Sequence, residues 1–302
     1  MESFSLSSPS DGALELEVYH DERGATNEGW LYHSFLCLPT ENKNRVIEKL
    51  CDFRKKTDWQ EDLHFKDLGS TVAENRLAQL WIDYFCNEGY KDFYFYLFGV
   101  NCLNLEKRLW KPPTRGIRIY NKFFQMGLYG ALKWFFIKQG NKVNIIQIYS
   151  HKKTRGPHDN FRFEPIQEIN FKAQLKEEPI DFKSKQIKEI GSDRNETGFD
   201  ESHVVQFVDI VMGTLGHIYD RETGKRGKDN CASVMLQYGL PKKLMAINPN
   251  SRYYKRFAVS FFPKAKLSKD EILNRHKNYY HNHFYSEREI KFGTQNQLLL
   301  EM

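Results

Sequence analysis

The sequence predicts an α/β fold in which helices flank a mixed β-sheet. Short segments that alternate in polarity or are continuously apolar, as strands are, are interspersed with longer segments whose apolar residues recur at helical spacing. Their order up to residue 149 is β-β-α-β-α-β-α-β, which is typical of helices layered on a sheet. The 302 residues include 23 Phe, 16 Tyr and 5 Trp, enough aromatic area for a substantial core.

The first predicted strand covers residues 14–19, where Leu14, Leu16 and Val18 alternate with other residues. An apolar segment at residues 30–38 predicts a second strand, so that residues 14–38 form a hairpin. The same periodicities predict a helix at 42–56, a short strand at 63–68, a helix at 71–87, a strand at 93–100, a helix at 118–137 and a strand at 143–149.

The second half of the chain changes in character. Residues 151–200 are charged and interrupted by Gly and Pro, which predicts an irregular insertion with a short strand near 187–190. A strongly apolar helix at 202–217 follows, then a polar loop at 220–230. We therefore predict a loose N-terminus at 1–12, an α/β domain at 13–217 that contains the insertion, and a basic, aromatic C-terminal extension or subdomain at 218–302.

Composition narrows the function classes. Lys and Arg number 45 against 39 Asp and Glu, and the resulting charge of +6 permits a nucleic-acid partner without requiring one. The five scattered cysteines form no Cys-x-x-Cys pair, which argues against a disulfide framework or a cysteine zinc site and favours the cytoplasm. The N-terminus has no secretory pattern, and the most apolar stretch, 126–137, is too short to span a bilayer, so we expect no membrane function.

The helix at 202–217 carries a polar stripe. His203, Gln206 and Asp209 recur at steps of three in a segment that is otherwise apolar nearly all round. A buried carboxylate needs a partner, which is either a divalent cation or a salt bridge or backbone group. In the same helix Gly213 and Gly216 indicate close packing.

Asp21 and Glu22 follow the first strand directly. Adjacent carboxylates need a cation or hydrogen-bond donors, although a polar hairpin turn also explains them. Hard cations prefer carboxylate oxygens, and two of them activate water and stabilise the leaving oxygen in phosphodiester cleavage. Asp21 and Asp209, a strand-end acid and an acid on a late helix, therefore predict an Mg²⁺ or Mn²⁺ site over the sheet.

Three segments carry a family resemblance. Asp21-Glu22-Arg23-Gly24 resembles the Asp-Glu-Ser-Gly signature of a bacterial ribonuclease H-like family, domain-of-unknown-function family thirty-eight hundred. Residues 206–213 are similar to that family's Gln-Leu-Ala-Asp-Leu-x-x-Gly helix, and Leu63-His64-Phe65 resembles its short Leu/Ile-His strand. The resemblance covers about residues 14–217. It implies a ribonuclease H-like fold and metal-dependent nucleic-acid cleavage, in defence against phage.

The resemblance also implies roles for single residues. Asp21 and Asp209 would be metal ligands, and Glu22 a third ligand or a group that orients them. Gln206 and His203 would position the scissile phosphate or the attacking water. For His64 two interpretations stay open, a satisfied core histidine and a catalytic ligand.

The chain departs from the family pattern at two places. Arg23 replaces the usual Ser, and the strand at 143–149 ends in Ser150 and His151 where the family carries an acid. The candidates for the missing function are two histidines and two acids farther along: His151, His158, Asp159 and Glu164.

A basic, aromatic segment lies near residue 254. Arg252, Tyr253, Lys255 and Arg256 interleave cations with aromatic rings, as surfaces that bind single-stranded nucleic acid do, although an amphipathic strand explains them equally well. Farther on, the histidine-rich run at 276–283 predicts a helix face or a substrate contact.

These features favour a Mg²⁺- or Mn²⁺-dependent nuclease that hydrolyses phosphodiester bonds of RNA or DNA, as an effector of bacterial anti-phage defence. The missing acid keeps an alternative open: a catalytically degenerate ribonuclease H-like subunit that binds a partner protein such as an ATPase in a larger, oligomeric or multi-protein, assembly. A nucleotide-binding enzyme has no support, because the Gly-x-x-x-x-Gly-Lys-Ser/Thr loop is absent.

Overall fold

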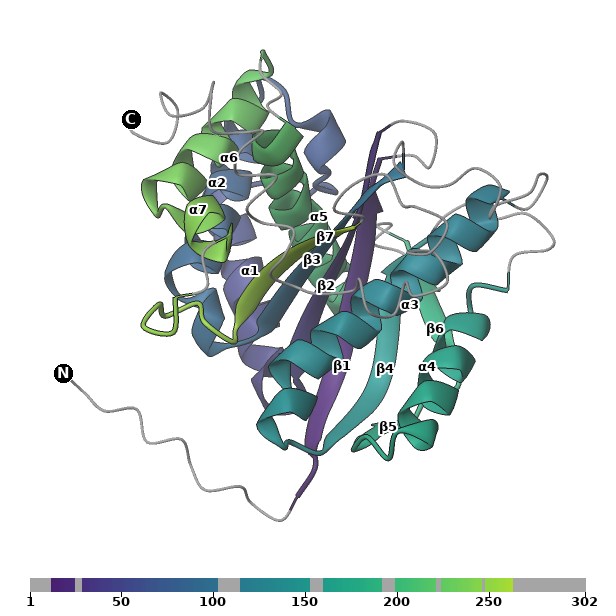
Figure 1. The fold of residues 1–302 in the computed structure, drawn as a ribbon. Coiled ribbons are helices and arrows are strands. Elements are labelled where there is room, and N and C mark those ends of the chain that lie inside the picture. Colours follow the sequence, from purple (N-terminus) through teal and green to yellow (C-terminus); the bar gives the residue numbers. More distant parts are fainter. Residues whose placement is uncertain are drawn as a thin grey trace.

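A mixed β-sheet with helices on both faces forms the centre of the protein in the computed structural model (Figure 1). The structure describes residues 12–24, 29–102, 115–152, 160–191, 199–220, 224–245 and 248–262. Within these ranges the sheet has seven strands in the order β5-β4-β1-β2-β3-β7, and β6 also pairs with β4.

This mixed sheet flanked by helices confirms the predicted α/β fold class. β1, β2 and β3 form an antiparallel meander, and β4 pairs parallel with β1 on its other side. β5 and β6 continue the sheet parallel to β4, and β7 pairs parallel with β3 at the opposite edge. The strands are β1 (Leu14–Arg23), β2 (Trp30–Pro39), β3 (Tyr94–Asn101), β4 (Val143–His151), β5 (Ile180–Phe182), β6 (Ile187–Ile190) and β7 (Phe257–Phe262).

The helices divide between the two faces of the sheet (Figure 1). α5 packs against β1, β2 and β4, and α1, α2 and α6 pack against α5. α3 and α4 pack against each other over the opposite face. The helices are α1 (Lys43–Thr57), α2 (Val72–Asn87), α3 (Arg115–Phe135), α4 (Glu164–Leu175), α5 (Phe199–Asp220), α6 (Arg226–Gln237) and α7 (Leu240–Met245). Within the described ranges, no helix combines the length and the apolarity that crossing a bilayer requires.

Alternation along β1 determines which polar side chains meet. Successive residues of a strand point to opposite faces. Asp21 and Arg23 face α5, where the Arg23 guanidinium donates to the backbone oxygen of Gly213 at 2.7 Å. Glu22 faces α3 and accepts a hydrogen bond from Tyr120 at 2.7 Å. One strand end therefore supplies two separate polar regions.

Three local predictions need correction. The segment predicted as a strand at 63–68 contains a 3-10 turn, Phe65–Asp67, because its backbone N–H groups are hydrogen-bonded to side chains of α5 and not to a neighbouring strand. The predicted loop at 220–230 is interrupted by the start of α6 at Arg226. The predicted insertion contains regular structure, namely α4, β5 and the strand expected at 187–190, which is confirmed as β6.

The predicted domain boundaries at residues 12 and 217 remain predictions. Beyond residue 217 the chain forms α6 and α7 and returns to the sheet as β7, beside β3.

Candidate functional site

Asp21 and His151 lie side by side at the ends of two parallel strands. The register of β1 and β4 pairs His20 with Ser150, so the next residues along, Asp21 and His151, are neighbours. His151 Nδ1 lies 3.7 Å from Asp21 Oδ1. The Glu22 backbone N–H donates to the same carboxylate oxygen at 2.8 Å, and Asp21 is only 5% exposed. The carboxylate is thus held in one orientation beside the imidazole.

Asp209 and His64 form a second pair of the same type. Asp209 Oδ2 on α5 lies 3.5 Å from His64 Nδ1 and accepts a hydrogen bond from the Phe65 backbone N–H at 2.9 Å. Hydrogen bonding to Asp209 raises the pKa of His64 above its ordinary value, against the opposing effect of burial. Asp209 is therefore compensated by an imidazole and a backbone donor.

Phe65 holds this second pair against α5. A Cβ atom added at Gly213 would lie 2.1 Å from the Phe65 ring, so the ring occupies space that only glycine leaves. The Arg23 guanidinium and the Lys228 ammonium lie 5.6 Å and 5.0 Å from the ring centroid. The predicted close packing at Gly213 is confirmed, and it positions the residue that follows His64.

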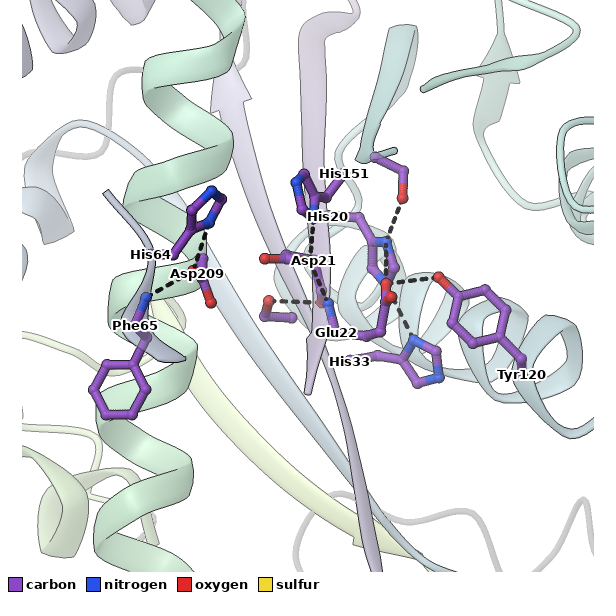
Figure 2. A network of polar contacts seen from close by, with 11 residues as sticks. His20, Asp21, Glu22, His33, His64, Phe65, Tyr120, His151 and Asp209 are labelled. Carbon is purple, nitrogen blue, oxygen red and sulfur yellow. Dashed lines mark hydrogen bonds and ion pairs between the residues drawn. The ribbon is translucent and has the colours of Figure 1, made fainter. Parts of the chain in front are cut away.

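The two pairs face each other across the seam between helix and sheet (Figure 2). The His64 and His151 ring centroids are 5.7 Å apart. The side chains of His64 and His151 are 20% and 31% exposed, so both rings are accessible to a ligand. We call Asp21, His151, His64 and Asp209 the Asp–His cluster; α5, the 61–65 segment, β4 and β1 each supply one of its members.

Glu22 lies on the other face of the sheet, which corrects its prediction as a partner of Asp21 (Figure 2). Its carboxylate accepts from Tyr120, lies 4.0 Å from His20 Nδ1, and its side chain is only 2% exposed. It belongs to a buried network in which His20 contacts Ser150 at 2.9 Å and His33 at 3.0 Å. Sequence reasoning missed this network, although alternation along β1 places residues 20 and 22 together.

His203 and Gln206 belong to a buried structural network and not to the Asp–His cluster. Arg54 of α1 donates to His203 Nδ1 at 3.1 Å and to Gln206 Oε1 at 2.6 Å. Gln206 Oε1 also accepts from the Leu63 backbone N–H at 2.8 Å, and Arg54 donates to the Glu61 backbone oxygen at 2.7 Å. Both predicted residues are 4% exposed. They position the 61–65 segment, which corrects their expected contact with a phosphate or a water.

The structure describes one of the other three candidates to replace the missing acid. Glu164 begins α4 and accepts a hydrogen bond from Asn121 at 3.3 Å. His158, Asp159 and the histidine-rich run at 276–283 lie outside the described residues.

The basic, aromatic segment at 252–256 forms a turn before β7. Tyr253 is 2% exposed and stacks on Phe257, so its ring belongs to the core and cannot stack on a base. Arg252 donates to the Cys86 backbone oxygen at 3.1 Å, and Arg256 lies 4.4 Å from the centroid of a tyrosine ring in β3. Lys255 is exposed, with a left-handed φ of 59°.

The side chains at the Asp–His cluster differ from those that the predicted metal site requires. Carboxylate oxygens suit Mg²⁺ and Mn²⁺, but both of these ions need several ligands around one point. In the Asp–His cluster each carboxylate lies against an imidazole. Over the described ranges no three His, Cys, Asp or Glu side chains are grouped so that they could hold a metal ion. The side chains as arranged therefore do not fit the predicted centre.

No family model matches the chain, and a search of curated proteins finds no match. Among solved structures the chain is similar to the ribonuclease HII of Archaeoglobus fulgidus, solved in complex with PCNA, at 10% sequence identity and a TM-score of 0.33. The similarity covers 76% of this chain and 90% of the other.

Proposed function

We propose that this protein is a nuclease that cleaves phosphodiester bonds at the Asp–His cluster. The observation that carries the proposal is the meeting of two Asp–His pairs, from four segments of the chain, with their rings 5.7 Å apart and partly exposed. Imidazoles exchange protons near neutral pH, and a carboxylate behind each ring fixes its orientation.

Cleavage needs a proton acceptor for the nucleophile and a proton donor for the leaving oxygen. We assign the donor role to His64, whose hydrogen bond to Asp209 raises its pKa above the ordinary value. His151, beside Asp21, is then the acceptor. Asp209 and Asp21 stabilise the imidazolium that each ring forms during the reaction. Because the arrangement does not fit the predicted ion, the proposed reaction uses the side chains of the Asp–His cluster alone, and the assay measures whether Mg²⁺ or Mn²⁺ is required.

The assay uses the purified full chain with single- and double-stranded RNA and DNA, each with Mg²⁺, with Mn²⁺ and with EDTA. Asp21→Asn and Asp209→Asn are each expected to lower the cleavage rate about 100-fold or more while the protein stays folded. Asp181→Asn is the matched control, since Asp181 lies on β5 in an exposed pair with Lys183. Cleavage by either of these two variants at the parental rate would contradict the assignment of the Asp–His cluster as the cleavage site.

A scaffold function is the second candidate, and one observation favours it. β4 ends in Ser150 and His151 in place of an acid, as a degenerate centre would. On this proposal the chain binds a partner such as an ATPase and cleaves nothing. Absence of cleavage under every condition, together with a stable complex in pull-down experiments that Asp209→Asn leaves intact, would establish it. The defence role rests on the sequence resemblance alone.

Nucleic-acid binding is proposed through exposed basic groups, which in the 252–256 segment include Lys255. Such contacts to phosphates release counterions, so affinity is expected to fall steeply with salt.

A further inference from the structure

We infer that the exposed face of α4 is a self-association surface, on which a second copy of this chain packs its own α4 in the antiparallel direction. The inference is independent of the proposed nuclease function. It follows from an apolar stripe along this helix and from the order of the charges beside the stripe.

Large apolar side chains are exposed along α4. Phe163, directly before the helix, is 47% exposed, Phe171 is 62% exposed and Leu175 is 69% exposed. They are three of the four large hydrophobic side chains that are exposed in the part of the chain that the structure describes. Their positions differ by multiples of four, so they lie along one face of a helix. Apolar side chains gathered in this way mark an interaction surface.

The opposite face of α4 holds the helix on the protein. Ile166, Ile169 and Ala173 are buried, and the helix packs against α3 and β5. Figure 1 shows α4 at the edge of the molecule, beside β5 and β6. The exposed stripe is therefore additional to the residues that attach the helix to its own chain.

The charges beside the stripe indicate what covers it. Glu164 and Glu168 belong to the first half of α4, whereas Lys172 and Lys176 lie in its last turn and directly after it. In an antiparallel pair with the twofold axis level with Asn170, Glu168 of each copy lies opposite Lys172 of the other copy. Glu164 then lies opposite Lys176 in the same way. The helix is thus complementary in charge to itself, as a twofold interface requires.

The same alignment places the larger of the two exposed side chains within α4 at the axis. Phe171 lies one residue from Asn170, which is about 1.5 Å along a helix, so the two Phe171 rings of a dimer meet there. Glu168 already lies 3.5 Å from Lys122 and 3.9 Å from Lys172 of its own chain, and these side chains are partly exposed. They form the rim of the interface, where charges of the second copy add to those pairs.

The dimer is expected to be weak. α4 has 12 residues and is therefore about 18 Å long. One helix pair of this length buries less than the roughly 800 Å² per partner of a standard interface. We therefore expect monomer and dimer to exchange between micromolar and millimolar protein.

The experiment is sedimentation equilibrium of the full chain over that concentration range. We expect a dimer to form as the concentration rises, and a monomer throughout overturns the inference. Phe171→Glu places like charges at the axis and is expected to weaken dimerisation about 100-fold or more. Val72→Glu is the matched control, because Val72 is 80% exposed at the start of α2. The control should dimerise as the parent does, and equal dimerisation of Phe171→Glu and the parent overturns the inference.

Charge reversal tests the antiparallel direction. Glu168→Lys and Lys172→Glu each place like charges opposite each other, and each variant alone is expected to dimerise about tenfold more weakly than the parent. An equimolar mixture of the two variants is expected to recover the parental affinity, because in the mixed dimer every lysine at these two positions faces a glutamate. A mixture that associates no better than its components overturns the inference.

Discussion

Two clusters of charged side chains link β1 of the sheet to α5, and their charges are neutralised in different ways. In the first, Lys43 of α1 lies between Glu17 of β1 and Glu201 of α5, at 3.0 Å and 2.8 Å; we call these three residues the lysine cluster. The second is the Asp–His cluster, whose Asp21 and Asp209 lie farther along the same strand and helix. Carboxylates from β1 and α5 thus approach each other twice.

The difference lies in the neutralising group. Burial is the largest single influence on Glu201 and raises its pKa, but the hydrogen bond to Lys43, a backbone hydrogen bond and the charges of Lys43 and Lys188 together lower it. Burial likewise opposes the charge of Lys43, and its hydrogen bonds to Glu201 and Glu17 raise its pKa overall. This cluster keeps fixed charges at neutral pH. The Asp–His cluster uses imidazoles, which exchange protons at that pH. This contrast separates a structural lysine cluster from the Asp–His cluster, for which we propose a reactive role.

The largest expected effect comes from replacing an imidazole of the Asp–His cluster with a lysine, the neutralising group of the lysine cluster. His151→Lys places a fixed cation beside Asp21 and removes the proposed proton acceptor. We expect the cleavage rate to fall about 1000-fold, or about 4 kcal/mol, with the melting temperature unchanged or higher. Rate measurements and thermal melts of parent and variant test this. A variant that cleaves normally would show that His151 transfers no proton.

The reverse experiment weakens the structural cluster. Lys43→Met leaves Glu17 and Glu201 close together without their cation, and we expect a loss of about 3 kcal/mol in the free energy of unfolding. Urea titration measures the loss. The folded fraction should cleave at the parental rate, so a strong loss of activity at full folding would contradict the separation of the two clusters.

A smaller effect is expected from a change that alters no charge. Gly213→Ala places a methyl group where the Phe65 ring lies, so the ring and the adjacent His64 must move. We expect a loss of about 2 kcal/mol in stability and reduced cleavage. Gly216→Ala, whose Cβ would meet the more flexible Arg23 side chain at 3.1 Å, is the matched control with a smaller loss. Equal effects of the two substitutions would argue against the role of Phe65.

The smallest expected effect is a pH dependence. The folded-state pKa of Glu201 is lower than its ordinary value, so its ionised form stabilises the protein above that ordinary value. This stabilisation is lost as the pH falls through the folded-state pKa. Urea midpoints of parent and Glu201→Gln, measured from pH 7 down to the acid range, should converge as the pH falls. A constant difference would show that Glu201 contributes no ionised-state stability.

The sequence allowed the elements of the sheet and two members of the Asp–His cluster to be predicted. Asp21 and Asp209 were predicted from the strand end and the helix stripe, and both belong to the cluster. His64 was a candidate because of the family resemblance, and His151 was one of four candidates to replace the missing acid. To identify His151 as the neighbour of Asp21, one must know the parallel register of β1 and β4, which no local sequence pattern predicts.

Other predictions failed for identifiable reasons. The Glu22 prediction overlooked strand alternation, which sends adjacent residues to opposite faces. The roles of His203 and Gln206 depend on Arg54, whose position in α1 gives no local sign of a long-range partner. The 63–68 strand failed because the backbone donors there reach side chains that lie about 140 residues away in sequence.

The attachment of the 61–65 segment to α5 has a mechanical consequence. Its backbone N–H groups donate to Gln206 and Asp209, and the Phe65 ring fills the space at Gly213, so His64 is attached to the same helix that carries Asp209. Asp21 and His151 are fixed by the sheet. The distance between the two Asp–His pairs is therefore set by how α5 packs on the sheet, whereas the spacing within each pair is set by the helix or by the sheet alone.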